Sequence, residues 1–153
     1  MHGQCTCGAV RYRLTDRPLF THACHCTWCQ RETGGPHALN AMIETDLLQV
    51  DGAVELVLTR SASGKGQEIA RCPQCRVAIY SHYAGAGRAL AFVRVGTLAD
   101  PAQCPPDIHI FTSTMLPWYH LPEGAVAVPD YYDRKVHWPD WALERYAALK
   151  ARR

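Results

Sequence analysis

The sequence lacks any long apolar run. Its longest apolar stretches are short and are broken by charged or turn-forming residues, whereas a membrane-spanning helix needs about 20 consecutive apolar residues. The first ten residues, MHGQCTCGAV, also lack the charged start and apolar middle of a secretory signal peptide. We therefore expect no membrane association and a cytoplasmic location.

An excess of charge of one sign is absent as well. The 153 residues include 16 basic and 14 acidic side chains, for a formal net charge of +2. Nucleic-acid-binding surfaces are strongly basic, so we expect no such partner; the basic end, Lys150, Arg152 and Arg153, is typical of a solvated helix terminus. The chain has no repeats or low-complexity segments, and its length suits one domain over residues 1–153. The sequence does not decide whether the protein forms a homo-oligomer.

Short segments with alternating apolar residues predict a mainly β fold. We expect strands over 9–15, 38–44, 54–60, 67–71, 77–82, 89–95 and 107–112. A short helix is expected within 25–33 and a C-terminal helix from Pro139, because proline suits a first helical position. Trp118, Trp138 and Trp141 should pack this C-terminal segment against the sheets. Strands joined by short turns favour small antiparallel sheets.

Cysteine, in contrast, is abundant and clustered. The eight cysteines form a pair (Cys5, Cys7), a triad (Cys24, Cys26, Cys29) and a second pair (Cys72, Cys75), with Cys104 alone. In a reducing compartment stable disulfides are rare, and such spacing favours a shared metal ion. Tetrahedral zinc accepts two pairs, since both sulfurs of each pair can face one ion. The two pairs therefore predict a closed structural zinc site that staples the first strand to the sheet.

Two other interpretations of Cys72 and Cys75 are weaker. A thioredoxin-type redox pair needs a following helix that lowers the pKa of the first thiol, but residues 77–80, VAIY, have a strand pattern. Cysteines also serve as small buried apolar side chains, which explains a single cysteine better than a matched pair.

The triad predicts a different kind of zinc site. Three thiolates lie within the six residues from Cys24 to Cys29, and no four-cysteine set remains for them. Three protein ligands with an exchangeable fourth position are typical of catalytic zinc. Water, a substrate thiol, His25 or Cys104 could be the fourth ligand; we expect His25 to point away from the ion, as a supporting or surface residue, and Cys104 to be an unliganded loop residue.

The charge of such a site favours thiol chemistry. Zinc with three thiolates has a formal charge of about −1 and activates water poorly. A thiol bound as fourth ligand would lose its proton at neutral pH and remain a nucleophile. It could attack an aldehyde carbon, or leave in the reverse reaction.

Six motifs follow one another along residues 3–120. They are Cys-x-Cys-Gly from Cys5, Cys-His-Cys-x-x-Cys-Gln-Arg-x-x-Gly from Cys24, Cys-Pro-x-Cys from Cys72, Gly96-Thr-Leu-x-Asp-Pro101, His109-Ile-Phe-Thr and Pro117-Trp118. This order resembles the glutathione-dependent formaldehyde-activating enzymes, a superfamily that also includes centromere protein V. The resemblance leaves residues 121–153 as a C-terminal extension.

The resemblance implies both the fold and an activity. It implies a zinc-stapled fold with a structural zinc on Cys5, Cys7, Cys72 and Cys75, and a second, exchangeable zinc on Cys24, Cys26 and Cys29, the catalytic site. It further implies a carbon–sulfur lyase that takes a glutathione-like thiol and a small aldehyde, giving S-hydroxymethylglutathione from glutathione and formaldehyde. Two zinc ions per chain follow, the second held less completely.

Some residues depart from this pattern or keep an open role. Arg76 stands where the family usually has glycine, and because arginine tolerates a positive φ poorly, we expect a slightly different turn. His37 replaces an aromatic residue and either adds a polar group near the triad or faces solvent. His109 is a core or a site residue, and Trp28 a pocket wall or a core residue. His22, His82, Arg31, Lys65 and Arg88 are interpreted as ordinary strand, loop or solvated residues.

Two other functions compete with the enzyme. In one, both zinc ions are structural and the protein is a non-catalytic module for protein or nucleic-acid interaction; the balanced charge counts against nucleic acid. In the other, the labile triad senses zinc or redox state. The sequence offers no convincing general base for the enzymatic reaction.

Overall fold

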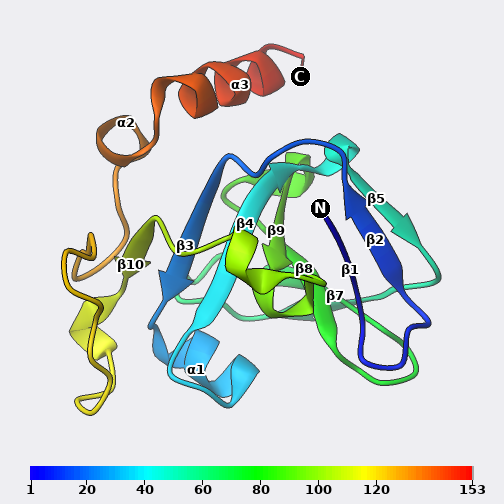
Figure 1. Cartoon of the computed structure of the whole chain (residues 1–153), viewed down its shortest axis with the longest axis horizontal. Helices are drawn as coiled ribbons and strands as arrows, with labels where there is room; N and C mark the ends of the chain where they lie inside the picture. The colour runs from blue at the N-terminus through cyan, green and yellow to red at the C-terminus, as the bar shows by residue number, and fades with distance from the viewer. Residues whose placement is uncertain (153) are drawn as a thin grey trace.

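Strands, nearly all antiparallel, are the main secondary structure of the chain (Figure 1). The computed structural model describes residues 1–152, so Arg153 of the basic end lies outside the described residues. The strands are β1 His2–Gln4, β2 Arg11–Leu14, β3 Phe20–Cys24, β4 Ala38–Glu44, β5 Leu48–Asp51, β6 Glu55–Thr59, β7 Gln67–Arg71, β8 Ala78–Tyr83, β9 Leu90–Arg94 and β10 Ile108–Ile110. The helices are α1 Thr27–Thr33, α2 Arg134–His137 and α3 Asp140–Ala151, with short 3₁₀ turns η1 Thr45–Leu47, η2 Gly87–Ala89, η3 Val95–Thr97, η4 Pro101–Gln103 and η5 Thr112–Thr114.

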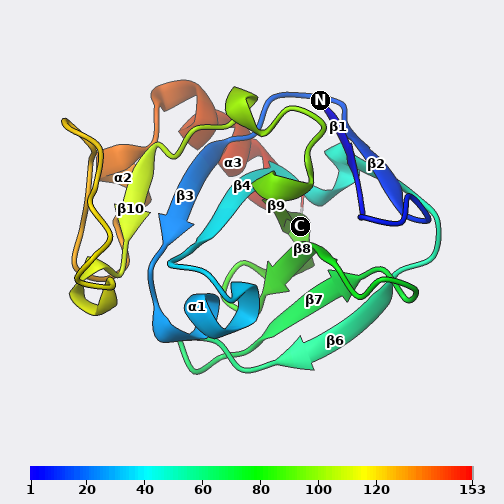
Figure 2. The same cartoon turned by 60° about the horizontal axis from the view of Figure 1, so that its bottom comes forward.

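The strands form two sheets. The larger sheet has seven strands in the order β10-β3-β4-β9-β8-β7-β6, and the smaller has three in the order β1-β2-β5; Figure 2 shows the two as separate layers. The expectation of small antiparallel sheets with short helices and a C-terminal helix is confirmed, with one exception. Strand β10 runs parallel to β3, so that Ile110 lies opposite Cys24. Parallel neighbours need a long crossover, here the chain from α1 to η4.

The large sheet separates two apolar clusters. Because successive side chains of a strand point to opposite faces, Ala41 and Ile43 of β4 join a cluster with the small sheet, whereas Met42 joins the other. Strand β9 alternates in the same way, with Val93 on the first side and Phe92 on the second. The seven-stranded sheet is therefore covered on one face by β1, β2 and their loops, and on the other by the C-terminal segment.

The C-terminal segment is fixed by aromatic contacts and by ion pairs of Arg145 and Arg152. The ring of Trp138 stacks on Phe20 with 5.8 Å between centroids, and its indole N–H donates to the Tyr132 hydroxyl at 3.0 Å. Arg145 of α3 donates to both carboxylate oxygens of Glu44 in β4. The expected packing of Trp138 is thus confirmed.

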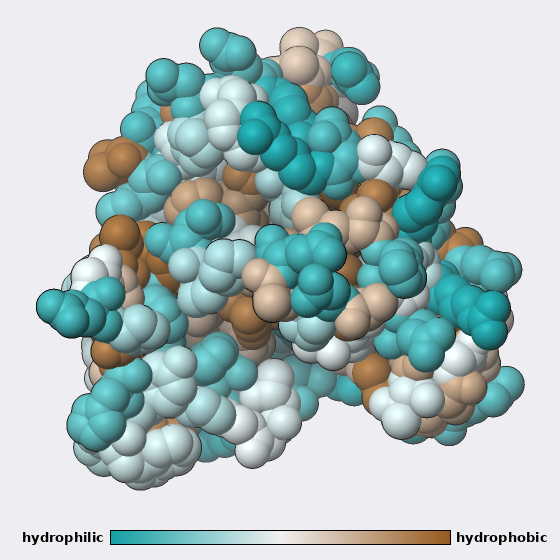
Figure 3. Space-filling model, in the orientation of Figure 1, coloured by the Kyte–Doolittle hydropathy of each residue, from teal (hydrophilic) through white to brown (hydrophobic). Residues whose placement is uncertain are grey.

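Trp118 does not share that role. Its side chain is 63% exposed, so the expectation that it packs the C-terminal segment is wrong. Figure 3 shows hydrophilic residues over most of this face of the molecule, with apolar residues in small separate patches. Within residues 1–152, no helix combines the length and the apolar character that crossing a bilayer would require.

Candidate metal centre

Four cysteines from two distant segments converge where the small sheet meets the large one. The sulfurs of Cys5, Cys7, Cys72 and Cys75 all lie within 4.8 Å of one another. Cys7 Sγ is 3.5 Å from Cys5 Sγ and 3.7 Å from Cys72 Sγ. The first pair comes from the loop between β1 and β2, and the second from the turn between β7 and β8. The fold therefore brings together the two cysteine pairs whose convergence the spacing predicted.

Backbone groups around the four sulfurs favour thiolates. The Val10 amide donates to Cys5 Sγ at 3.3 Å. Backbone N–H groups of Val77 and Cys7 point at Cys75 and lower its pKa to about 6. Four thiols packed this closely do not all keep their protons. A divalent cation that takes four ligands in tetrahedral geometry and prefers soft thiolates, such as zinc, fits this set. The donor set therefore fits a closed, structural metal site.

Arg76 takes the backbone conformation that its side chain disfavours. Its φ is 64°, in the left-handed region, so the turn is not reshaped to suit arginine, contrary to expectation. The Arg76 amide donates to the Cys72 carbonyl at 2.9 Å, and the Cys72 amide donates to the Val77 carbonyl at 3.0 Å. These bonds close the turn, and the Arg76 guanidinium pairs with Glu55.

The three remaining clustered cysteines meet at the start of α1. Cys24 ends β3, Cys26 caps the helix and Cys29 lies in its first turn. Their sulfurs also lie within 4.8 Å of one another, and all three side chains are buried. The Cys29 amide donates to Cys26 Sγ at 3.4 Å. In the described part of the chain no further cysteine, histidine or acidic residue joins this cluster, so the donor set has three members.

The triad is arranged to share negative charge. The thiols of Cys24 and Cys29 donate to the Cys26 sulfur, which lowers the pKa of Cys26 to about 3. A cation would take the place of those protons, because thiolates are the form that binds metal. Cys104 lies elsewhere: it is buried in the opposite core cluster, with its sulfur 3.5 Å from Met1 Sδ. The expectation that Cys104 is not a ligand of the triad site agrees with this position.

Comparison with known proteins supports the assignment that the motifs suggested. The family model "Glutathione-dependent formaldehyde-activating enzyme" matches residues 1–114. The chain belongs to this family. A protein of Halomonas elongata, whose name assigns it the same activity provisionally, is 38% identical over 55 residues, which is 35% of this chain and 35% of that protein. The match thus spans only about a third of the length of that relative.

One solved structure shows the same fold. The crystal structure of a Rhodobacter sphaeroides protein superposes with a TM-score of 0.50 at 24% identity, covering 67% of this chain and 94% of that one. The fold of the formaldehyde-activating family is thus shared with a solved protein. The family match ends at residue 114 and so leaves the C-terminal segment outside it.

His25, between two of the triad cysteines, anchors their loop. Its side chain turns away from the sulfurs, as expected, but it is fully buried rather than at the surface. Its Nε2 is 3.0 Å from Nδ1 of His109 in β10, and its carbonyl accepts from Gln30 Nε2 at 2.7 Å and from Thr114 Oγ1 at 3.2 Å. His109 is thus a buried residue outside the triad, and its ring supports the loop that carries the triad.

His37 packs on the same assembly. Its ring centroid lies 5.0 Å from that of His25 and 5.2 Å from that of Tyr119. Burial and the neighbouring His109 lower the pKa of His37, so its imidazole is neutral at pH 7. Of the two alternatives left open for His37, the structure favours the first: the residue is a partly buried polar group that packs behind the triad loop.

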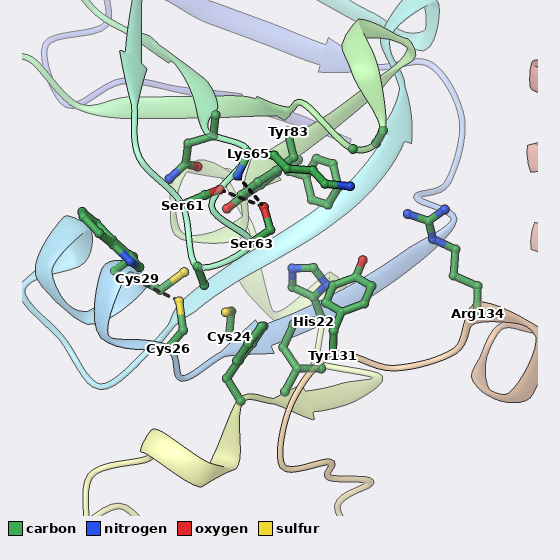
Figure 4. A pocket seen from close by; sticks show the side chains of 18 residues that line it. His22, Cys24, Cys26, Cys29, Ser61, Ser63, Lys65, Tyr83, Tyr131 and Arg134 are labelled. Carbon is green, nitrogen blue, oxygen red and sulfur yellow. Dashed lines mark hydrogen bonds between the residues drawn. The ribbon is translucent and has the colours of Figure 1, made fainter.

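A cavity of about 240 Å³ opens beside the triad sulfurs (Figure 4). Its walls are mainly aromatic and apolar: Trp28, Tyr83, Phe92, Ile110, Phe111 and Tyr131. Trp28 therefore belongs to the pocket wall, which settles the alternative left open by the sequence. Tyr131 comes from the C-terminal segment, which sequence reasoning had treated only as packing. The sequence could not predict that Tyr131 lines this pocket, because no local pattern shows where the C-terminal segment packs on the rest of the chain.

His22 is a functional candidate that the sequence interpretation missed. It lines the pocket from the same face of β3 as Cys24, two residues away. Its Nε2 lies 3.5 Å from the Asn40 amide nitrogen, and Arg94 Nη1 donates to the amide oxygen of Asn40. Asn40 therefore presents a donor to Nε2, which places the imidazole proton on Nδ1.

The Nδ1 atom of His22 has no hydrogen-bond partner among the described residues. Burial, with Arg94 nearby, lowers the pKa of His22 to about 3, so the ring stays neutral and keeps a free N–H. His22 could have been found because it lies two residues before Cys24, on the same face of a strand. The strand itself was not predicted, however, since β3 is buried on both faces and its sequence, FTHAC, does not alternate.

Proposed function

We propose that the protein is a zinc-dependent carbon–sulfur lyase-type enzyme that adds glutathione or a similar thiol to formaldehyde or another small aldehyde, and catalyses the reverse. One observation carries the proposal: three buried sulfurs converge, without a fourth described ligand, beside a pocket. Cys24, Cys26 and Cys29 would hold the exchangeable zinc. Cys5, Cys7, Cys72 and Cys75 would hold a structural zinc, and the many reduced thiols suit a cytoplasmic location.

Zinc bound by the triad would supply a coordination position in which a thiol loses its proton at neutral pH. The residues of the chain do the rest. The apolar walls of the pocket exclude water from the reacting atoms and lower the local dielectric. In the addition, a sulfur–carbon bond forms, the carbonyl π electrons move to oxygen, and the thiol proton ends on that oxygen.

His22 has the properties of a donor for that oxygen. Its N–H is neutral, fixed in tautomer by Asn40 and without a protein partner. Donors placed where negative charge develops on a carbonyl oxygen stabilise the transition state. We assign His22 the role of hydrogen-bond donor to the aldehyde oxygen, which supplies the polar group that the sequence did not reveal.

The test follows S-hydroxymethylglutathione formation from glutathione and formaldehyde above the spontaneous rate. Cys26→Ser should abolish the acceleration, because it removes one of three sulfurs. Cys104→Ala is the matched control, since Cys104 is also buried but lies outside both clusters; it should keep wild-type activity. A wild-type protein no faster than Cys26→Ser would contradict the reaction and favour the non-catalytic module.

A further inference from the structure

The pocket beside the triad has two chemically different ends. The sulfurs of Cys24, Cys26 and Cys29 lie at one side, and in Figure 4 Lys65 and Arg134 both extend on the opposite side. Aromatic side chains separate the two ends. A ligand whose reacting atom meets the sulfurs would therefore place its far end between two cationic groups.

Neither cation is neutralised by the protein. The ion pairs of the described residues involve other arginines, and no carboxylate lies within ion-pair distance of Lys65 or Arg134. The Nε of Arg134 is buried and has no hydrogen-bond partner. A buried N–H of a guanidinium without a partner is costly, and two lining cations without a neighbouring carboxylate leave this end of the pocket positively charged.

Arg134 is held in place rather than free to seek solvent. Its Nη1 donates to the Tyr146 hydroxyl at 2.8 Å, and its guanidinium lies 4.9 Å from the ring centroid of Tyr146 and 5.5 Å from that of Trp138. Lys65 is exposed, and its backbone amide donates to Ser63 Oγ at 3.3 Å. The charge of Arg134 is therefore fixed at the pocket, whereas that of Lys65 lies at its exposed rim.

The pocket is small, and aromatic and apolar side chains make up much of its lining. Its volume of about 240 Å³ lies below the roughly 300–1,000 Å³ of typical ligand pockets. Glutathione carries amide groups along its length, and beside walls such as Phe92 and Phe111 these groups would lose hydrogen bonds to water. The Ser61, Ser63 and Gln67 side of the lining offers neutral polar groups that could replace some of them. A flat aromatic or branched aliphatic body fits this lining better.

We propose that the thiol substrate has an aromatic or branched aliphatic body and a carboxylate at its far end, which Arg134 and Lys65 bind. This inference rests on the proposed function, because the thiol end is taken to meet the triad. Arg134 and Tyr131 lie beyond residues 1–114, which match the family model. The C-terminal segment therefore supplies one of the two cations and part of the aromatic wall of this pocket.

The test measures binding to the zinc-loaded protein by titration calorimetry, with three thiols: para-(mercaptomethyl)benzoate, uncharged para-methylbenzyl thiol and glutathione. We expect the carboxylated aromatic thiol to bind about tenfold more tightly than the uncharged one, equivalent to about 1.4 kcal/mol. Glutathione should bind more weakly than the carboxylated aromatic thiol.

Variants of the two cations assign the effect. Arg134→Gln should remove most of the preference for the carboxylated thiol. Lys65→Gln should lower the preference for the carboxylated thiol by only about threefold, because exposed ion pairs are weak. Neither should change binding of the uncharged thiol, which also shows that each variant is folded. Lys135→Gln is the matched control, since Lys135 follows Arg134 in α2 but lies outside this pocket; it should behave as wild type.

The outcomes separate this inference from the proposed function. Equal binding of the charged and uncharged aromatic thiols, or tighter binding of glutathione, would overturn the assigned substrate class while glutathione turnover could still proceed. Loss of formaldehyde addition with every thiol, together with a retained preference for the carboxylated one in calorimetry, would instead overturn the reaction and leave the binding site standing.

Discussion

The two cysteine clusters use the same ligand atom in different settings. The four-cysteine cluster joins two segments 65 residues apart, as the contact between Cys7 and Cys72 shows, and it lies where the two sheets meet. The triad comes from six consecutive residues and borders a pocket. A cluster that closes a long loop contributes to folding, whereas one that leaves a coordination position beside a pocket is suited to chemistry.

The sharpest way to break this comparison is to remove one sulfur from each cluster. Cys72→Ser should lower the free energy of unfolding by more than about 4 kcal/mol, because loss of a structural metal is among the largest single-residue effects. Cys26→Ser should cost far less stability while removing activity. Chemical denaturation followed by circular dichroism measures both; a Cys72→Ser variant as stable as Cys26→Ser would show that the four-cysteine cluster is not the staple.

Metal removal sharpens the same contrast without mutation. The as-isolated protein should hold up to two zinc ions, and a mild chelator should remove the triad ion while the fold is retained. Removal of the other ion should coincide with unfolding. Zinc release followed with a colorimetric indicator, alongside circular dichroism, tests this; release of both ions in one step would contradict the distinction.

A smaller effect is expected from the donor in the pocket. His22→Phe keeps a ring of similar size but removes the N–H, and should lower kcat by about tenfold to hundredfold, because single oxyanion donors contribute on this scale. KM and zinc content should change little. His2→Phe, at an exposed position on β1, is the control. A wild-type kcat in His22→Phe would remove His22 from the reaction.

The support of the triad loop predicts a still smaller effect. His109→Phe leaves the buried Nε2 of His25 without its partner, and outer partners that orient a metal-binding loop affect metal affinity by about 10–100-fold. We expect zinc affinity of the triad to fall by about tenfold, measured by competition with a chelator of known affinity. His120→Phe, at an exposed position, should leave it unchanged, and equal affinity in both variants would show that His109 is only a core residue.

The smallest effect concerns the turn at the four-cysteine cluster. Arg76→Gly relieves a positive φ that costs about 1–2 kcal/mol in a residue with a side chain. Glycine loses more freedom on folding, by about 0.5–1 kcal/mol, so the net gain should stay below about 1 kcal/mol. A thermal unfolding scan should show a slightly higher Tm; a clear decrease would mean that the exposed pair with Glu55 matters more than the backbone.

Local patterns predicted most of the fold. The strands at 38–44 and 67–71 have the expected bounds, and the other expected strands differ only at their ends. Strand β3 was missed because all five of its residues are buried, which leaves no alternation in the sequence. The three residues of β1 were too few to produce a pattern. The parallel position of β10 depends on the route of the chain and could not follow from periodicity.

The site divides in the same way. Spacing alone predicted which cysteines converge, because sulfurs two or three residues apart can face one point. The roles of His22, Arg134 and Tyr131 depend on contacts between segments far apart in the chain, such as the one that brings Tyr131 to the pocket of Cys24. Lys65 was interpreted as solvated, and its exposure agrees; only its neighbours give it a role.

The parallel strand β10 also orders events during synthesis. His109 meets His25 across 84 residues, so the loop that carries the triad gains its contacts with His109 and Thr114 only after these residues have left the ribosome. The four-cysteine cluster, in contrast, has all of its sulfurs once Cys75 has emerged. A nascent chain would therefore hold the cysteines of both clusters before it has the residues that support the triad loop.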